Sequence, residues 1–183
     1  MQSQLTLSLT FVDDMLDLSQ IGAGVFSLTV SDFDPNNVFK MIQEIFQPQA
    51  NSKNIELTAT TTYFLNPPNF VMNDISAPEN LETKLPRLLG DERRLKQVLI
   101  NLVRNSLKFT KRGAIRVQAS YNPIEQELII HVRDSGAGIE KEDLEKLFSR
   151  FGKLQRTASM NSEGVGLGLT IVKQVVEANH GQI

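Results

Sequence analysis

The stretch DERRLKQVLINLVRNSLKFTKRG, residues 91–113, decides how the rest of the chain is interpreted. Its apolar residues recur at helical spacing, and Asp91 offers a side-chain acceptor at the start. These features predict a helix that Asp91 caps and that Gly113 breaks. The residues expected on its buried stripe are Leu95, Val98, Leu99, Leu102 and Val103.

A second, polar stripe runs along the same helix, about a quarter-turn or more from the apolar one. A neutral amide oxygen on such a stripe is a hard ligand that suits Mg²⁺, and a lysine ammonium can meet a phosphate as a point charge. Taken alone, however, the stripe favours an ordinary solvated helix face. Its members are Arg94, Gln97, Asn101, Asn105 and Lys108.

Outside this helix, residues 114–121 and 127–134 alternate regularly and predict two strands, which favours an antiparallel sheet with helices on one side. Asp34 and Pro35 predict a helix start. Further strands are predicted at 25–30 and 55–60, a surface loop at 66–84, and a last helix at 167–178. Residues 2–21 are interpreted as a helix, either an ordinary core helix or a bundle or dimer helix.

The hexapeptide DSGAGI, residues 134–139, directly follows the second of these strands. Asp134 has the parity of the strand's inward residues, so its carboxylate is expected to point towards the helix layer and to need a donor there. The exocyclic amine of adenine would serve, and the two glycines would let backbone approach a flat ligand closely. The alternative is a simple turn in which local N–H groups satisfy Asp134.

Two further motifs precede the chain's last helix. EGVGLGL, residues 163–169, presents glycine-rich backbone N–H groups at a helix N-terminus, which suits an anion, although a hinge is the alternative. A short helix predicted at 141–151 carries Phe148 and Phe151, with Arg150 and Lys153 beside them. These phenylalanines are either core residues or the anchor of a lid.

In this order, the asparagine helix, Asp-x-Gly-x-Gly, Phe-x-x-Phe and Gly-x-Gly-x-Gly resemble the N, G1, F and G2 boxes of the sensor histidine kinase catalytic domain, within the GHKL ATPase superfamily. The similarity runs from about residue 85 to 183, and residues 16–33 resemble the end of the kinase's dimerisation helix and its linker. The resemblance implies an α+β fold, a two-layer α/β sandwich with a mixed, mainly antiparallel sheet and helices on one face. Residues 1–24 would then be the remnant of the dimerisation helix and linker, and residues 25–183 the ATP-binding catalytic domain without its C-terminal strand.

The resemblance also implies how magnesium and phosphate are held. Asn105 is the expected Mg²⁺ ligand, with Asn101 supporting the same site, and Lys108 would hold phosphate. A cation, either Arg150 or Lys153, would face the terminal phosphate. The glycine-rich start of the last helix would flank the phosphates, and its residues are Gly164, Gly166, Leu167 and Gly168.

For the purine, the resemblance implies a pocket at the end of the 127–134 strand. Asp134 would accept a hydrogen bond from the adenine amino group, and Phe109 would form a wall. Gly136 and Gly138 would make room for the ring, with Ile139 packing nearby.

The implied reaction is transfer of the ATP γ-phosphoryl group to a histidine on another segment or chain, and onward in a phosphorelay. Asn101 stands where hydrolytic members of the superfamily carry a glutamate that activates water, which favours transfer over hydrolysis. No phosphoacceptor box is present, and His131 and His180 are predicted to be structural, so this chain alone is not expected to autophosphorylate. The alternatives are a non-catalytic nucleotide- or partner-binding fragment and a GHKL ATPase.

Composition excludes several classes of protein and of site. The 183 residues are 40% hydrophobic and 22% charged, which is globular composition, and the net charge of −2 argues against a basic nucleic-acid footprint. The absence of cysteine excludes disulfides, thiolate metal sites and cysteine nucleophiles. The chain is expected to be soluble at the cytoplasmic face of a parent protein that a membrane could anchor. Its expected partners are a phosphoacceptor histidine domain, a receiver domain, and a second copy through the N-terminal helix.

Overall fold

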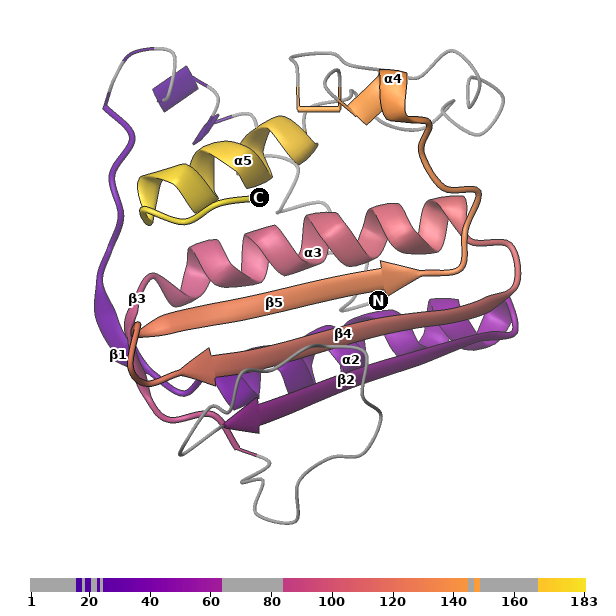
Figure 1. Cartoon of the computed structure of the whole chain (residues 1–183), viewed down its shortest axis with the longest axis horizontal. Coiled ribbons are helices and arrows are strands. Elements are labelled where there is room, and N and C mark those ends of the chain that lie inside the picture. The colour runs from indigo at the N-terminus through magenta and orange to yellow at the C-terminus, as the bar shows by residue number, and fades with distance from the viewer. Residues whose placement is uncertain are drawn as a thin grey trace.

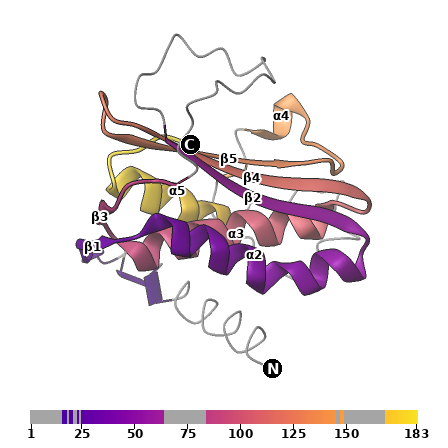
Figure 2. The same ribbon diagram turned by 90° about the horizontal axis from the view of Figure 1, so that it is seen from below.

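The computed structural model describes residues 16–17, 19–20, 23, 25–63, 84–144, 147–148 and 168–183. Three long helices cover one face of a three-stranded sheet, so the chain forms two layers (Figures 1 and 2). The helices are α2 (Pro35–Ser52), α3 (Glu92–Phe109) and α5 (Gly168–Ala178), and the strands are β2 (Ile55–Tyr63), β4 (Gly113–Asn122) and β5 (Glu127–Asp134). This arrangement confirms the predicted two-layer α+β class.

The main sheet has the order β2-β4-β5 and is mixed. β2 runs parallel to β4, with Ile55 opposite Gly113, because α3 lies on the connection between the two strands. β4 and β5 pair antiparallel, with Ile115 opposite Asp134. A separate antiparallel pair joins β1 (Ser31–Phe33) to β3 (Leu88–Gly90), and a single helical turn, α4 (Lys141–Leu144), follows β5.

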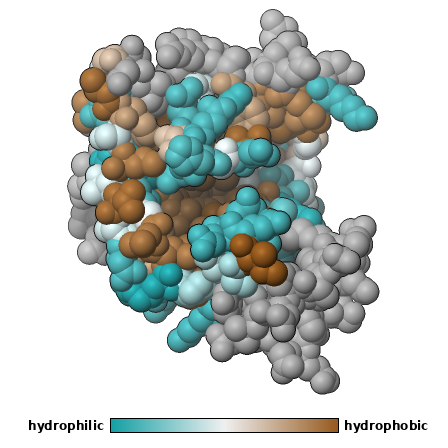
Figure 3. Space-filling view, turned by 60° about the vertical axis from the view of Figure 1, so that its left-hand side comes forward, coloured by the Kyte–Doolittle hydropathy of each residue, from teal (hydrophilic) through white to brown (hydrophobic). Residues whose placement is uncertain are grey.

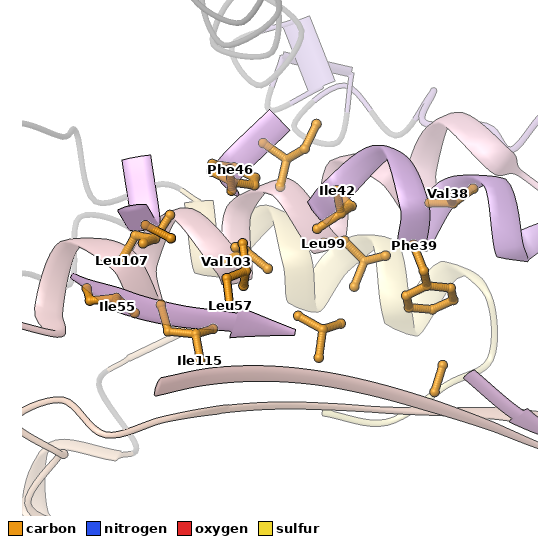
Figure 4. Close-up of a cluster of buried hydrophobic side chains, with 14 of the residues drawn as sticks. Val38, Phe39, Ile42, Phe46, Ile55, Leu57, Leu99, Val103, Leu107 and Ile115 are labelled. Atoms are coloured by element: carbon orange, nitrogen blue, oxygen red, sulfur yellow. The ribbon is translucent and has the colours of Figure 1, made fainter. Parts of the chain in front are cut away.

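The main core lies between α2, α3 and the sheet (Figure 4). Its apolar side chains come from the inward stripes of both helices and from the alternating residues of β2 and β4, and each fully buried one contributes about 1.5–3 kcal/mol. A second cluster, Val98 with Ile171, Val172 and Val175, packs α5 against α3. α3 is therefore held by apolar contacts on two sides, which gives its polar stripe a defined position. The labelled residues of the main core are Val38, Phe39, Ile42, Phe46, Ile55, Leu57, Leu99, Val103, Leu107 and Ile115.

The helix starts agree with the caps read from the sequence. The Asp34 side chain accepts a hydrogen bond from the Asn36 N–H, and the Asp91 side chain accepts one from the Arg94 N–H at 3.0 Å. At the other end, α3 stops at Phe109, before Gly113. Gly113 instead begins β4 with φ +108, where a Cβ would collide with the Ser135 side chain, so glycine is required at this position.

The predicted strand at 25–30 is wrong. This segment has no regular structure, and strand pairing begins only at Ser31, opposite Gly90 of β3. The segment is instead tied to the start of α3, because the Thr29 N–H donates to the Asp91 carboxylate at 2.7 Å. Alternation of apolar and polar residues is therefore not enough to predict a strand, because a strand also needs a partner whose backbone lies within hydrogen-bonding reach.

Apolar side chains remain exposed on the side of the molecule that carries β1, β3 and the 25–30 segment (Figures 1 and 3). Val25 and Val30 are each 64% exposed, and Leu89 is 80% exposed. None of the helices in the described ranges combines the length and apolarity that crossing a membrane requires.

The remaining predicted elements fall partly outside the described residues. Residues 16–17 and 19–20 are helical, as predicted, but the rest of the 2–21 helix lies outside the described ranges. The predicted loop at 66–84 also lies outside them, apart from Lys84. Of the helix predicted at 141–151, the structure describes α4 and a turn at 147–148.

Candidate functional site

Three chain segments that are far apart in the sequence meet along the C-terminal half of α3. They are the second half of α3 itself, the end of β5 with the turn that follows it, and the first residue of α5 (Figure 1). The sheet register brings β5 alongside the helix layer, and the apolar cluster between α3 and α5 fixes the start of α5. The site predicted from the sequence is distributed over these three segments.

Asp134, at the end of β5, points towards α3 as its parity predicted. One carboxylate oxygen accepts a hydrogen bond from the Ser106 hydroxyl at 3.0 Å, and the other accepts the Gly136 N–H at 2.9 Å. The side chain is exposed, however, so the expectation of a buried carboxylate is wrong. Each carboxylate oxygen can accept more than one hydrogen bond, which leaves Asp134 able to accept from a ligand as well.

The two glycines after Asp134 differ in what surrounds them. A Cβ on Gly136 would lie 2.8 Å from both the Phe109 carbonyl oxygen and an Asp134 carboxylate oxygen, so the close approach here is made by the end of α3 and by the Asp134 side chain. Gly138 has φ +69, and a Cβ there would meet nothing within 4 Å. Next to it, Ile139 is 49% exposed. The open space that a flat ligand would need therefore lies at Gly138 and Ile139.

The side chains in the first half of the polar stripe on α3 are buried and hydrogen-bonded. Arg94 and Gln97 are buried, so the interpretation of a solvated face is wrong for them. The Arg94 guanidinium and the Gln97 amide, the latter at 2.7 Å, both donate to the buried Asp17 carboxylate. The Arg94 guanidinium also stacks 4.4 Å from the centroid of the Phe26 ring. These contacts dock residues from the N-terminal part of the chain onto α3.

The second half of the stripe lies at the convergence. Asn101 is fully buried, and its side-chain oxygen accepts a hydrogen bond from the Arg104 guanidinium at 2.7 Å. Asn105, one turn later, is half-buried, and its amide makes no hydrogen bond to any described residue. Lys108 is also half-buried, and its ammonium lies 5.3 Å from the centroid of the Phe109 ring. An available amide oxygen near a lysine suits a hard cation that also binds phosphate.

Part of the predicted site lies outside the described residues. Of the predicted Phe148 and Phe151 pair, the structure describes Phe148. Its carbonyl oxygen lies 3.3 Å from the Thr170 hydroxyl of α5, and the centroid of its ring lies 5.9 Å from the Lys173 ammonium. Within the described ranges, no group of three or more histidine, cysteine, aspartate or glutamate side chains is placed to hold a metal ion. The predicted residues outside these ranges are Arg150, Lys153, Gly164, Gly166 and Leu167.

Three residues of this region were not predicted. Ser106 anchors Asp134 from 28 positions away, a pairing that no local pattern reveals. Thr110, at the end of α3, is buried with a hydroxyl that meets no hydrogen-bond partner among the described residues. Arg104 was detectable in principle, because residues three apart on a helix are neighbours and it follows Asn101 at that spacing.

The family model of the histidine kinase-, DNA gyrase B- and HSP90-like ATPases matches residues 90–183, which covers the whole convergence. The chain belongs to this ATPase family. Within the family it is a histidine kinase catalytic domain, the ATP-binding domain of two-component signalling proteins.

Relatives and solved structures support the same placement. Hybrid signal transduction histidine kinase L of Dictyostelium discoideum is 35% identical over 180 residues, and the autoinducer 2 sensor kinase/phosphatase LuxQ of Vibrio cholerae is 32% identical over 178 residues. Each alignment covers 96% of this chain but only 9% and 18% of the relative, respectively. Full-length ShkA, crystallised in complex with AMPPNP, superposes with a TM-score of 0.69 at 28% identity, covering 93% of this chain and 30% of ShkA.

Proposed function

We propose that this histidine kinase domain binds ATP with Mg²⁺ and transfers the γ-phosphoryl group to a histidine on another segment or chain, from which it passes to a receiver aspartate. One observation carries the proposal. On α3, Asn101 lies against Gly168 at the start of α5, Ser106 anchors the Asp134 carboxylate at the end of β5, and the half-buried Asn105 stands between Asn101 and Ser106 along the helix. Such a row of groups matches a purine at one end and phosphates at the other.

The individual roles follow from that row. Asp134 would accept from the purine amino group, with the ring in the open space at Gly138 and Ile139. Asn105 would hold Mg²⁺ through its free amide oxygen, and Lys108 would meet a phosphate. The remaining phosphate ligands are proposed in the glycine-rich segment before α5, at Gly164, Gly166 and Gly168, with Lys153 or Arg150 at the terminal phosphate.

In the proposed reaction, a nitrogen of the acceptor imidazole forms a bond to the γ-phosphorus while the bond to the bridging oxygen breaks and ADP leaves. The acceptor's proton is released to solvent or base on the acceptor side. Asn105 and Lys108 would hold Mg²⁺ and phosphate, the metal when bound would supply charge neutralisation, and the chain itself would contribute mainly position and electrostatics. Residue 101 is an asparagine, whose side-chain oxygen accepts a hydrogen bond from Arg104. A neutral amide cannot act as the general base that activates a water molecule for hydrolysis. This supports transfer over hydrolysis.

We also propose that residues 1–24 belong to the acceptor-bearing dimerisation region and residues 25–183 to the catalytic domain. The docking of Asp17 on α3 gives this division a physical contact, because a charged side chain with 3% of its surface exposed ties the two parts together. The proposed partners are an acceptor histidine domain and a receiver domain.

The test supplies a separate acceptor histidine domain, Mg²⁺ and γ-labelled ATP. Label should reach the acceptor, and Asn105→Ala should lower the rate by roughly a hundredfold or more, since it removes a group that stabilises transferring charge. Asn37→Ala, an exposed asparagine on α2, is the matched control and should leave the rate unchanged. ATP binding without labelling would instead support the non-catalytic alternative. Steady phosphate release without any acceptor would support an ATPase.

A further inference from the structure

The hydroxyl of Ser106 links α3 to the end of β5. Ser106 is buried, with 6% of its surface exposed, and its hydroxyl donates to one carboxylate oxygen of Asp134 at 3.0 Å. A serine inside a helix commonly donates to the backbone carbonyl one turn earlier. A hydroxyl has a single proton to donate, and here that proton goes to a side chain 28 positions away in the sequence.

The Asp134 carboxylate is held at both of its oxygens. The second oxygen accepts the Gly136 N–H at 2.9 Å, within the same turn. Rotation of an aspartate carboxylate about its last torsion is otherwise easy, and with both bonds made it would break at least one of them. Of the two bonds, the one from Ser106 fixes the carboxylate relative to α3. The carboxylate is nevertheless exposed, so it remains open to a ligand.

The pair of Ser106 and Asp134 presents acceptors to whatever meets the carboxylate. An ionised carboxylate has only lone pairs, and the one proton of the hydroxyl is already donated to it. A ligand group at this position must therefore bring a donor. A site built to accept from an N–H group discriminates against analogues that lack it. A fixed carboxylate should accordingly matter more for the choice between purines than for binding of the triphosphate.

Ser106 directly follows Asn105, the residue proposed to hold Mg²⁺. Successive helix residues diverge by about 100°, so the two side chains leave the same turn of α3 in different directions. Resting on the proposed function, we infer that Ser106 is a positioning residue for purine selection. It fixes the Asp134 carboxylate so that the carboxylate accepts from the exocyclic amino group of adenine and disfavours purines without that group.

The experiment compares ATP with purine riboside triphosphate, in which hydrogen replaces the exocyclic amino group. Calorimetry in the presence of Mg²⁺ gives both affinities for the unaltered 183-residue chain and for Ser106→Ala. The unaltered chain should bind ATP roughly tenfold more tightly than the analogue. Ser106→Ala should reduce this preference to about threefold by weakening ATP alone. Alanine suits a helix and leaves no buried donor unpaired, so the variant should fold.

Ser135→Ala is the matched control, because Ser135 also holds the end of β5. Its hydroxyl accepts the Ala114 N–H at 2.9 Å and donates to the Arg112 carbonyl at 3.1 Å. This variant should keep the roughly tenfold preference for ATP, since the Ser106 bond is intact. An equal fall in both variants would mean that any loosening of β5 has this effect, and it would overturn the role of Ser106. Ser106→Cys, whose thiol is a weak donor, should give an intermediate preference.

A double substitution tests whether Ser106 acts through the carboxylate. Asp134→Asn alone should abolish most of the preference for ATP. Adding Ser106→Ala to Asp134→Asn should then lower the ATP affinity no further, because residues that act as one unit are not additive. A further loss of about threefold in the double variant would show that Ser106 acts independently of Asp134, which contradicts the inference.

The outcomes also separate this inference from the proposed function. If the unaltered chain prefers ATP and Ser106→Ala keeps the whole preference, the inference is wrong and the proposed function stands. An equal loss for ATP and the analogue has the same meaning, since Ser106 then serves only the fold. If the unaltered chain binds both nucleotides equally, the purine role of Asp134 is wrong together with the inference. If it binds neither, the proposed function is overturned as well.

Discussion

The two halves of the polar stripe on α3 have the same helical spacing but differ in the partners that their side chains meet. In the first half, the charge of Arg94 is paired with Asp17 and covered by the Phe26 ring. In the second half, Asn105 is half-buried and its amide makes no hydrogen bond to any described residue. One helix therefore carries a structural lock at its N-terminal end and a candidate ligand site farther along.

The difference comes from what packs against each half. A carboxylate brought from 77 positions away neutralises the first half, and burial without that partner would be costly. The second half faces Gly168 and the end of β5, where the glycines at 168 and 136 allow close contacts and open space is found only at Gly138 among the described glycines. We expect substitutions in the first half to change stability and substitutions around the second half to change nucleotide affinity.

The largest effect is expected from Asp17→Asn. It leaves the buried Arg94 guanidinium without its counter-charge, which typically costs roughly 3–5 kcal/mol. The free energy of unfolding, measured by urea denaturation, should fall by up to that amount. The ATP affinity of the folded variant should not change, because the α3 residues that Asp17 contacts, Arg93, Arg94 and Gln97, lie in the N-terminal half of that helix.

The matched control is the exposed ion pair between Arg87 and Asp32. Its atoms are 2.8 Å apart, but its side chains are 60% and 57% exposed. Solvent screens such a pair, so Arg87→Ala should leave the denaturation midpoint unchanged within error. Equal losses in Asp17→Asn and Arg87→Ala would contradict the idea that burial makes the Asp17 contact a lock.

A smaller effect is expected from Asp134→Asn, and it should appear in affinity. The new amide can keep its oxygen for the Gly136 N–H and donate its NH₂ group to the Ser106 hydroxyl oxygen, but that NH₂ group would then oppose the amino group of adenine. ATP should bind roughly ten times more weakly by calorimetry, and the thermal midpoint should stay close to that of the unaltered chain. Ser106→Ala, which removes only the anchor, should cost less affinity, and unchanged ATP binding in Asp134→Asn would refute the purine role.

The smallest effects are expected from Gly136 and Gly138, and they should distinguish the role of one glycine from that of the other. Gly136→Ala forces a Cβ against both the Phe109 carbonyl oxygen and the Asp134 carboxylate, so it should lower the free energy of unfolding by about 1 kcal/mol or more. Gly138→Ala meets open space and carries only the cost of its φ of +69, so its main effect should be weaker ATP binding. Denaturation and calorimetry on both variants check this, and weaker ATP binding in Gly136→Ala alone would reverse the assignment.

Several features were predictable because they depend on local chemistry. The caps at Asp34 and Asp91, the β5 strand at 127–134 and the direction of the Asp134 side chain were all predicted from residue type and periodicity, and all are confirmed. The strand predicted at 25–30 failed because alternation cannot show whether a partner strand lies within reach. The roles of Arg150, Lys153 and the glycines before α5 stay predictions.

The order and spacing of the motifs indicated, without any structure, the family and the two-layer class, and they predicted residues for one candidate site. The tertiary structure decided which polar side chains of α3 are closed by a partner and which remain available. The physical reason is that these partners are far apart in the sequence. Asp17 lies 77 positions from Arg94 and Ser106 lies 28 positions from Asp134, and Gly168 and Asn101 are also distant, so such contacts depend on the packing of whole elements. Periodicity places a side chain on a face of its own helix, whereas only the fold supplies the partner that it meets there.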